Sequence, residues 1–116
     1  METFEMTTNS SVNLSVGISS DANVGSNVNL NDKLIKKSRQ YSFKSDIGNS
    51  NDIHNGMLSV VSNFFVNDNN IDIIMNNTTV KYLLKDSMNT KNYECKKVKI
   101  NNNLFMAYIV IKLLGN

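Results

Sequence analysis

The apolar residues of the chain follow two different patterns. Up to about residue 50, isolated apolar residues stand among Ser, Asn and Gly, whereas dense apolar runs begin at Met57. The length allows one folded domain. We therefore predict a Ser/Asn-rich N-terminal region at residues 1–50, with a basic segment at 33–44, and a small α+β domain at residues 51–116. A core of that size is marginal alone and often needs a partner or self-association.

Residues 12–18 alternate strictly between apolar and small polar side chains, and the same register continues to Leu30. The apolar positions are Val12, Leu14, Val16 and Ile18. A period of two is typical of a β-strand. Low apolar density also predicts disorder. Two interpretations therefore stay open: a pair of strands with a turn at residues 19–21, docked on the domain or on another chain, or a disordered arm.

Residues 32–44 are basic, with apolar residues between the cations. Asn31 or Asp32 is a suitable N-cap, so a short helix is predicted there. Residues 45–56 contain two Gly and several Asn and Ser, a composition typical of a linker.

Residues 57–66 have the helical pattern i, i+1, i+4, i+7, i+8, which places one apolar stripe on a helix, with Asn67 suited to end it. The stripe consists of Met57, Leu58, Val61, Phe64 and Phe65. The β-branched run at residues 71–75 then predicts a short strand.

Residues 78–88 fit two patterns. A helix capped by Thr78 or Thr79 would have Val80, Leu83, Leu84 and Met88 on one face. A strand after a turn at Asn76 and Asn77 would have Val80, Tyr82 and Leu84 on one face. The helix is slightly favoured.

The C-terminal segment has the clearest β pattern. Residues 93–100 alternate with an irregularity near Lys96 and Lys97, and the three Asn at 101–103 suit a hairpin loop. Leu104–Leu114 is apolar on both faces, which predicts a central strand covered on both sides. If no other element covers it, the exposed face implies a binding partner. The predicted fold is thus a small α+β domain with a C-terminal β-hairpin and one or two short helices, preceded by a polar arm that forms strands or stays disordered.

Composition bears on the origin of the chain. It contains 21 Asn and 11 Lys but a single Arg and no Pro, so it is rich in residues with A/T-rich codons and poor in those with G/C-rich codons. This favours an A/T-rich genome, for example that of a virus. Cys95 is the only cysteine, so no intrachain disulfide forms. The N-terminus has no basic residue and no long apolar stretch, which favours an intracellular protein, in the cytoplasm or in that of a host cell.

Charge is divided into four zones along the chain. Residues 1–32 and 51–79 carry acids only, whereas 33–50 and 80–116 are mainly basic, and the net charge is +2. If the fold joins the basic zones, they form one patch that attracts polyanions in a salt-dependent way. The candidate residues for single-stranded nucleic acid, RNA included, are Lys33, Lys36, Lys37, Arg39, Lys96, Lys97 and Lys99 for phosphates and Tyr41 for base stacking.

No enzyme, cofactor or metal site is predicted. His54 is the only histidine, and structural zinc usually takes four Cys or His ligands. Residues 68, 70 and 72 match the first three ligands of a calcium-binding EF-hand loop. Ile73 and Thr79, however, stand where that loop needs Gly and Glu.

These observations favour a non-enzymatic interaction or structural subunit, such as an accessory protein of a virus, that binds a protein partner or forms an oligomer. The alternative is a nucleic-acid-binding protein that uses the two Lys-rich clusters. No membrane span is predicted, because the longest apolar run is much shorter than the roughly 20 residues that a spanning helix needs.

Overall fold

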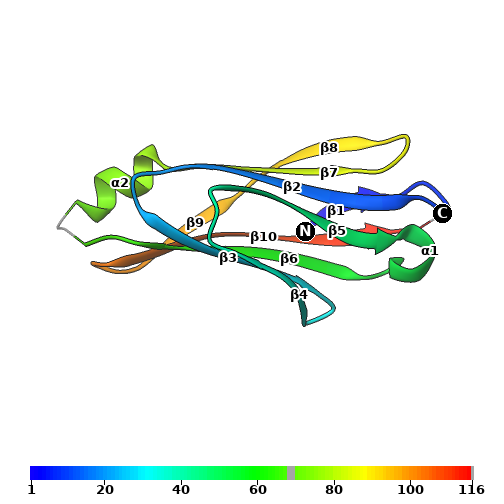
Figure 1. Cartoon of the computed structure of the whole chain (residues 1–116), viewed down its shortest axis with the longest axis horizontal. Helices are drawn as coiled ribbons and strands as arrows, with labels where there is room; N and C mark the ends of the chain where they lie inside the picture. Colours follow the sequence, from blue (N-terminus) through cyan, green and yellow to red (C-terminus); the bar gives the residue numbers. More distant parts are fainter. Residues whose placement is uncertain (68–69, 116) are drawn as a thin grey trace.

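The computed structural model describes residues 1–67 and 70–115, which form two stacked β-sheets and two short helices (Figure 1). The strands are β1 Glu2–Glu5, β2 Ser11–Ser19, β3 Asn23–Leu30, β4 Lys33–Ser38, β5 Ser42–Asn49, β6 Met57–Phe65, β7 Thr79–Lys85, β8 Thr90–Glu94, β9 Lys96–Asn101 and β10 Leu104–Leu114. The helices are α1 Ser50–Ile53 and α2 Ile71–Asn77. The molecule is elongated, with principal extents of 48 × 24 × 23 Å.

The larger sheet has the strand order β1-β10-β6-β3-β4, and the smaller sheet has the order β5-β2-β7-β8. β9 also belongs to the larger sheet. It pairs with residues 104–108 of β10, and β1 pairs in parallel with residues 111–114, so both strands lie along the same edge of β10. Figure 1 shows the two layers, with α2 at one end of the sandwich and α1 at the other.

Alternate residues of the strands fill the space between the sheets. The smaller sheet contributes Val12, Leu14, Val16, Tyr82 and Leu84, and the larger sheet contributes Val28, Leu58, Val60, Phe64, Phe105 and Ile111. The rings of Phe64 and Phe105 stack with centroids 4.7 Å apart. Because a sandwich buries one face of each strand, strands with only every second residue apolar can still form its core.

The predicted α+β fold with a separate N-terminal arm is wrong, because the chain is mostly β and both sheets include strands from residues 1–50. The strand interpretation of residues 12–30 is confirmed by β2 and β3, and the disordered arm is wrong. The two strands do not pair with each other, however. Residues 20–22 carry the chain from the smaller sheet to the larger one.

The helix predicted at 57–66 is wrong, because this segment is strand β6. Its buried residues are Leu58, Val60, Ser62 and Phe64, a strict period of two. The sequence of this segment does not show a clear alternation of apolar and polar residues, because one of its inward positions is polar. Ser62 is buried because its hydroxyl forms a 2.7 Å hydrogen bond with that of Ser26 on β3.

The assignments after β6 are reversed. The strand predicted at residues 71–75 is the helix α2, and the favoured helix at 78–88 is wrong because Thr79–Lys85 form the strand β7. Both segments are short and apolar, and in such segments periodicity cannot separate a helix from a strand. The pairing of β7 with β2 and β8 decides its conformation.

The short helix predicted at 32–44 and the linker at 45–56 are also wrong. Asn31 and Asp32 both have positive φ, 52° and 66°, and form a two-residue turn between β3 and β4 instead of capping a helix. β5 and α1 replace most of the linker.

The C-terminal hairpin is present, but the single strand predicted over residues 93–100 and the covering of Leu104–Leu114 on both sides are wrong. β9 and β10 form the hairpin, and the irregularity lies at Cys95, where the chain leaves β8 of the smaller sheet and enters β9 of the larger one. β10 is an inner strand, but only one of its faces is fully buried. Val110 on the opposite face is 37% exposed.

Candidate interaction surface

The outer face of the larger sheet is defined by the register of its strands. Residues paired across neighbouring strands point to the same side of a sheet. Through these pairs, one row runs across the face in the order Lys37, Asn27, Val61, Tyr108 and Lys96, on β4, β3, β6, β10 and β9. We call it the central row. It has a cation at each end, and between the cations the polar Asn27 lies next to Lys37 while Tyr108 lies next to Lys96 and Val61 stands in the middle.

Apolar side chains extend from the central row along the strands. Phe65 pairs with Leu104, and Met106 pairs with Val98. The outer patch, as we call it, consists of Val61, Phe65, Val98, Leu104, Met106, Tyr108 and Val110. Of these, Phe65 is 50% exposed and Val98 39% exposed. The polar residues Ser59 and Asn63 of β6 lie among these apolar residues, paired with Val110 and Met106. Exposed apolar side chains gathered on one sheet face are a common mark of a protein-binding surface.

No described element covers the outer patch. The helix α1 contacts β5 of the smaller sheet, and α2 contacts the end of β10 and β9. In Figure 1 both helices lie at the ends of the sandwich. This face is therefore open to solvent.

The outer face of the smaller sheet differs sharply from this surface. On β2 its residues are Ser11, Asn13, Ser15, Gly17 and Ser19. Among the described residues, Leu83 on β7 is the single large apolar side chain on that face. A polar outer face is what a strand exposed to water requires, so the outer patch is a property of one face of the molecule.

The fold separates the two predicted basic clusters. Lys33, Lys36 and Lys37 lie on β4, with Arg39 and Tyr41 in the connection to β5. The second cluster, Lys96, Lys97 and Lys99, lies on β9. β4 and β9 are at opposite edges of the larger sheet, so the clusters do not form a single patch.

Several of the candidate residues have structural contacts. Lys97 Nζ donates to the carbonyl oxygens of Met75 and Thr78 at 2.9 and 3.0 Å, at the end of α2, and Lys99 forms an ion pair with Asp72 at 3.2 Å. The Tyr41 hydroxyl donates to the Ala22 carbonyl at 2.6 Å.

Lys37 and Lys96 differ from these residues, because they make no hydrogen bond or ion pair with the described part of the chain. Lys96 lines the same hollow as Glu2 and Glu94, but it forms no ion pair with either acid, so the ammonium groups of Lys37 and Lys96 remain available to a ligand on the outer face. They are also the two cations that end the central row.

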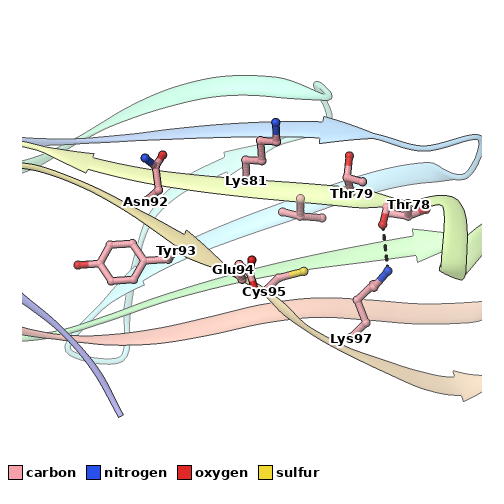
Figure 2. A pocket seen from close by; sticks show the side chains of 9 residues that line it. Thr78, Thr79, Lys81, Asn92, Tyr93, Glu94, Cys95 and Lys97 are labelled. Carbon is pink, nitrogen blue, oxygen red and sulfur yellow. Dashed lines mark hydrogen bonds between the residues drawn. The ribbon is translucent and has the colours of Figure 1, made fainter.

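A separate groove of about 660 Å³ lies where β8 leaves the smaller sheet (Figure 2). Thr79 and Lys81 line one side, and Glu94, Cys95 and Lys97 line the other. Burial raises the pKa of the Cys95 thiol, and the nearby charge of Lys97 offsets this only in part. The thiol is therefore protonated at neutral pH and is a weak nucleophile.

In residues 1–67 and 70–115 no three His, Cys, Asp or Glu side chains gather in a way that suits a metal ion. Of the calcium-like pattern, Asp68 lies outside the described residues, and Asp72 is paired with Lys99. His54 is exposed beside Asn55, whose side-chain nitrogen lies 3.4 Å from His54 Nδ1.

None of the helices in the described part of the chain combines the length and the hydrophobicity that a membrane-crossing helix needs. Comparison of the chain with protein-family models, with curated proteins and with solved structures gives no match.

Sequence reasoning identified only part of this surface. The two apolar faces of Leu104–Leu114 did indicate a binding partner for an uncovered strand. The contribution of Val61 and Phe65 was missed, because both residues were assigned to a helical stripe. The signal was the alternation of residues 57–65, once Ser62 is accepted as an inward position.

Proposed function

We propose that the protein is a non-enzymatic binding subunit that contacts another protein through the outer patch. One observation carries this proposal. β10 is apolar on both faces, its inner face fills the core, and the outer face has no covering element among the described residues.

The hydrophobic effect explains why such a face favours a partner. Burying apolar area contributes roughly 25 cal/mol per Å², so leaving it in water is unfavourable when a complementary surface exists. The polar face of the smaller sheet supports this interpretation, because the same chain avoids apolar residues there. An A/T-rich viral genome and an intracellular location are further parts of the proposal and rest on composition alone.

Site-specific photocrosslinking in the cells that naturally make the protein tests this function. A photoreactive phenylalanine analogue would replace Phe65 in one variant and Val110 in a second, both on the outer patch. The matched control places it at Ser15, on the outer face of the smaller sheet. We expect discrete protein adducts from positions 65 and 110 and none from position 15.

Each alternative has its own outcome. Adducts that disappear after nuclease treatment would instead support nucleic-acid binding, and adducts of twice the chain mass would support self-association. Equal labelling from position 15, or none from any position, would reject the outer patch as a binding surface.

A further inference from the structure

We propose that the segment bound by the outer patch is an amphipathic helix with acidic residues on both sides of its apolar face. This inference rests on the proposed function and specifies the chemistry of the partner. It is carried by the central row, in which Lys37 and Lys96 stand on opposite sides of the apolar residues of β6 and β10, with the polar Asn27 of β3 between Lys37 and Val61.

The distance between the two Lys residues suits one helix. Lys37 and Lys96 are on strands four steps apart, which corresponds to roughly 19 Å at about 4.8 Å per step. A helix with its side chains is about 10–12 Å across. A helix lying along β6 and β10 therefore fits between the two Lys backbones, and each ammonium group can reach a carboxylate on its own side.

The length of the outer patch suits a helix of ordinary size. From Leu104 to Val110 the strand advances six residues, about 20 Å at 3.3 Å per residue. A helix covers that distance in about 13 residues at 1.5 Å each. Helices also pack onto sheets as a separate layer, which is the arrangement that this side of the larger sheet lacks.

Charge argues against a second copy of the chain as the occupant. A face-to-face dimer has its twofold axis in the plane of contact. If the axis is centred on Val61 and runs along the strands, Lys37 of one copy faces Lys96 of the other. If it runs along the central row, each Lys faces its own counterpart, so either arrangement opposes like charges.

The aliphatic character of the outer patch argues against nucleic acid. Single strands bind by stacking on aromatic rings and by phosphate contacts. Apart from Phe65 and Tyr108, the outer patch consists of Val, Leu and Met side chains, which offer no ring for stacking. Two Lys residues at opposite edges also provide little continuous positive charge.

A charge-exchange experiment tests the inference. Two synthetic amphipathic helical peptides would share the same Leu and Phe residues and differ only in their flanks, Glu in one and Lys in the other. Their affinities would be measured by fluorescence anisotropy against the full chain. We expect the wild type to bind the Glu-flanked peptide roughly tenfold more tightly, since complementary charges favour it.

Variants of Lys37 and Lys96 test whether the central row causes the preference for the Glu-flanked peptide. Lys37→Glu with Lys96→Glu should reverse the preference, and Lys37→Gln with Lys96→Gln should abolish it. The matched control, Lys44→Glu with Lys81→Glu, makes the same charge change on the outer face of the smaller sheet and should keep the wild-type preference. A melting curve of each variant establishes that it is folded.

Equal affinity of the wild type for the two peptides would overturn the inference, as would an unchanged preference in the Lys37→Glu and Lys96→Glu variant. Competition of a single-stranded oligonucleotide for the peptide site would favour nucleic acid instead. Concentration-dependent dimerisation in sedimentation, lost in a Val110→Asp variant, would favour a second copy. Crosslinking at position 65 without peptide selectivity would retain the proposed function and reject only the acidic helix.

Discussion

At the scale of single residues, Asp86 shows how one buried polar group joins distant parts of the chain. Its carboxylate accepts hydrogen bonds from the Thr7 backbone at 2.7 Å, from the Thr7 hydroxyl at 3.2 Å, and from the backbone of Met88 and Asn89. Burial by itself raises the pKa of Asp86, but these hydrogen bonds outweigh it and lower the pKa below its ordinary value. The carboxylate thus ties the segment after β1 to the β7–β8 hairpin.

Asp86→Asn should destabilise the fold by about 1–3 kcal/mol at pH 7. The amide nitrogen would replace one carboxylate oxygen, and it cannot accept the hydrogen bonds that this oxygen accepts in the wild type. Because the pKa of Asp86 is depressed in the folded protein, its carboxylate stabilises the fold fully above the ordinary Asp pKa of about 3.9. This stabilisation is lost as the pH falls from about 3.9 through the lower pKa of the folded state. The free energies of unfolding of the two proteins should therefore converge at low pH. Urea unfolding at pH 7 and pH 3 measures this, with the exposed Asp21→Asn as control. The same difference at both pH values would contradict it.

Tyr82 is a buried polar residue of the opposite kind. Its hydroxyl approaches Ser62 but has no hydrogen-bond partner among the described residues, and burial raises its pKa. Tyr82→Phe removes this unsatisfied group and keeps the ring, so we expect thermal stability to stay the same or rise. Tyr93→Phe is the control, since the Tyr93 hydroxyl donates to the Thr3 carbonyl at 2.7 Å and its removal should lower the melting temperature. A large loss in Tyr82→Phe would show that its hydroxyl is bonded in solution.

At the scale of elements, β10 is the strand around which the larger sheet is organised. It pairs with β6 along most of its length and with β1 and β9 on the other side. Its alternate residues serve two purposes. Phe105, Ala107, Ile109 and Ile111 are in the core, whereas the residues between them form much of the outer patch.

Substitution of two neighbouring residues of β10 tests this division. Ile109→Asp buries a carboxylate that has no partner, which costs several kcal/mol, and a small domain has about 5 kcal/mol of stability to lose. We expect this variant to be insoluble or unfolded. Val110→Asp, one residue further on the open face, should remain soluble with a similar circular dichroism spectrum. Equal behaviour of the two variants would contradict the register.

At the scale of the whole molecule, the sandwich is held together by contacts between segments far apart in the sequence. Glu2 pairs with Ile111, and the Met6 backbone N–H donates to the Leu114 carbonyl, so the two ends of the chain lie side by side in one sheet. Such non-local pairing delays folding, because the chain must close a long loop before β1 can pair with β10.

Residues 1–31 should therefore resist limited proteolysis as strongly as the rest of the chain. Val16→Lys should lower the melting temperature, since Val16 is 3% exposed and a buried cation has no partner there. Asn13→Lys, on the outer face of the same strand and paired with Asp46 on one side and Lys85 on the other, is the matched control and should have little effect. Rapid removal of residues 1–31 without loss of the melting transition would show that they are not part of the folded core.

The sequence determined the elements whose pattern is local and strict. β2 was predicted from four alternating apolar residues, and the hairpin of β9 and β10 from its three Asn between two β patterns. In these segments successive side chains alternate between the two faces of the sheet, and this alternation does not depend on the neighbouring strands. The outer patch was anticipated in part for the same reason, because Leu104–Leu114 has no polar face to turn toward water.

Tertiary structure decided what a local pattern leaves open. β6 was mistaken for a helix because Ser62 is polar, and only Ser26 on the neighbouring strand makes its burial favourable. The end of α2 is satisfied by Lys97, a residue of β9, and β7 is a strand because β2 and β8 lie on either side of it. The separation of the Lys clusters likewise follows from the strand order. The conformation of these segments depends on hydrogen-bond partners and neighbouring strands that are distant in sequence. Short-range periodicity cannot reveal such partners.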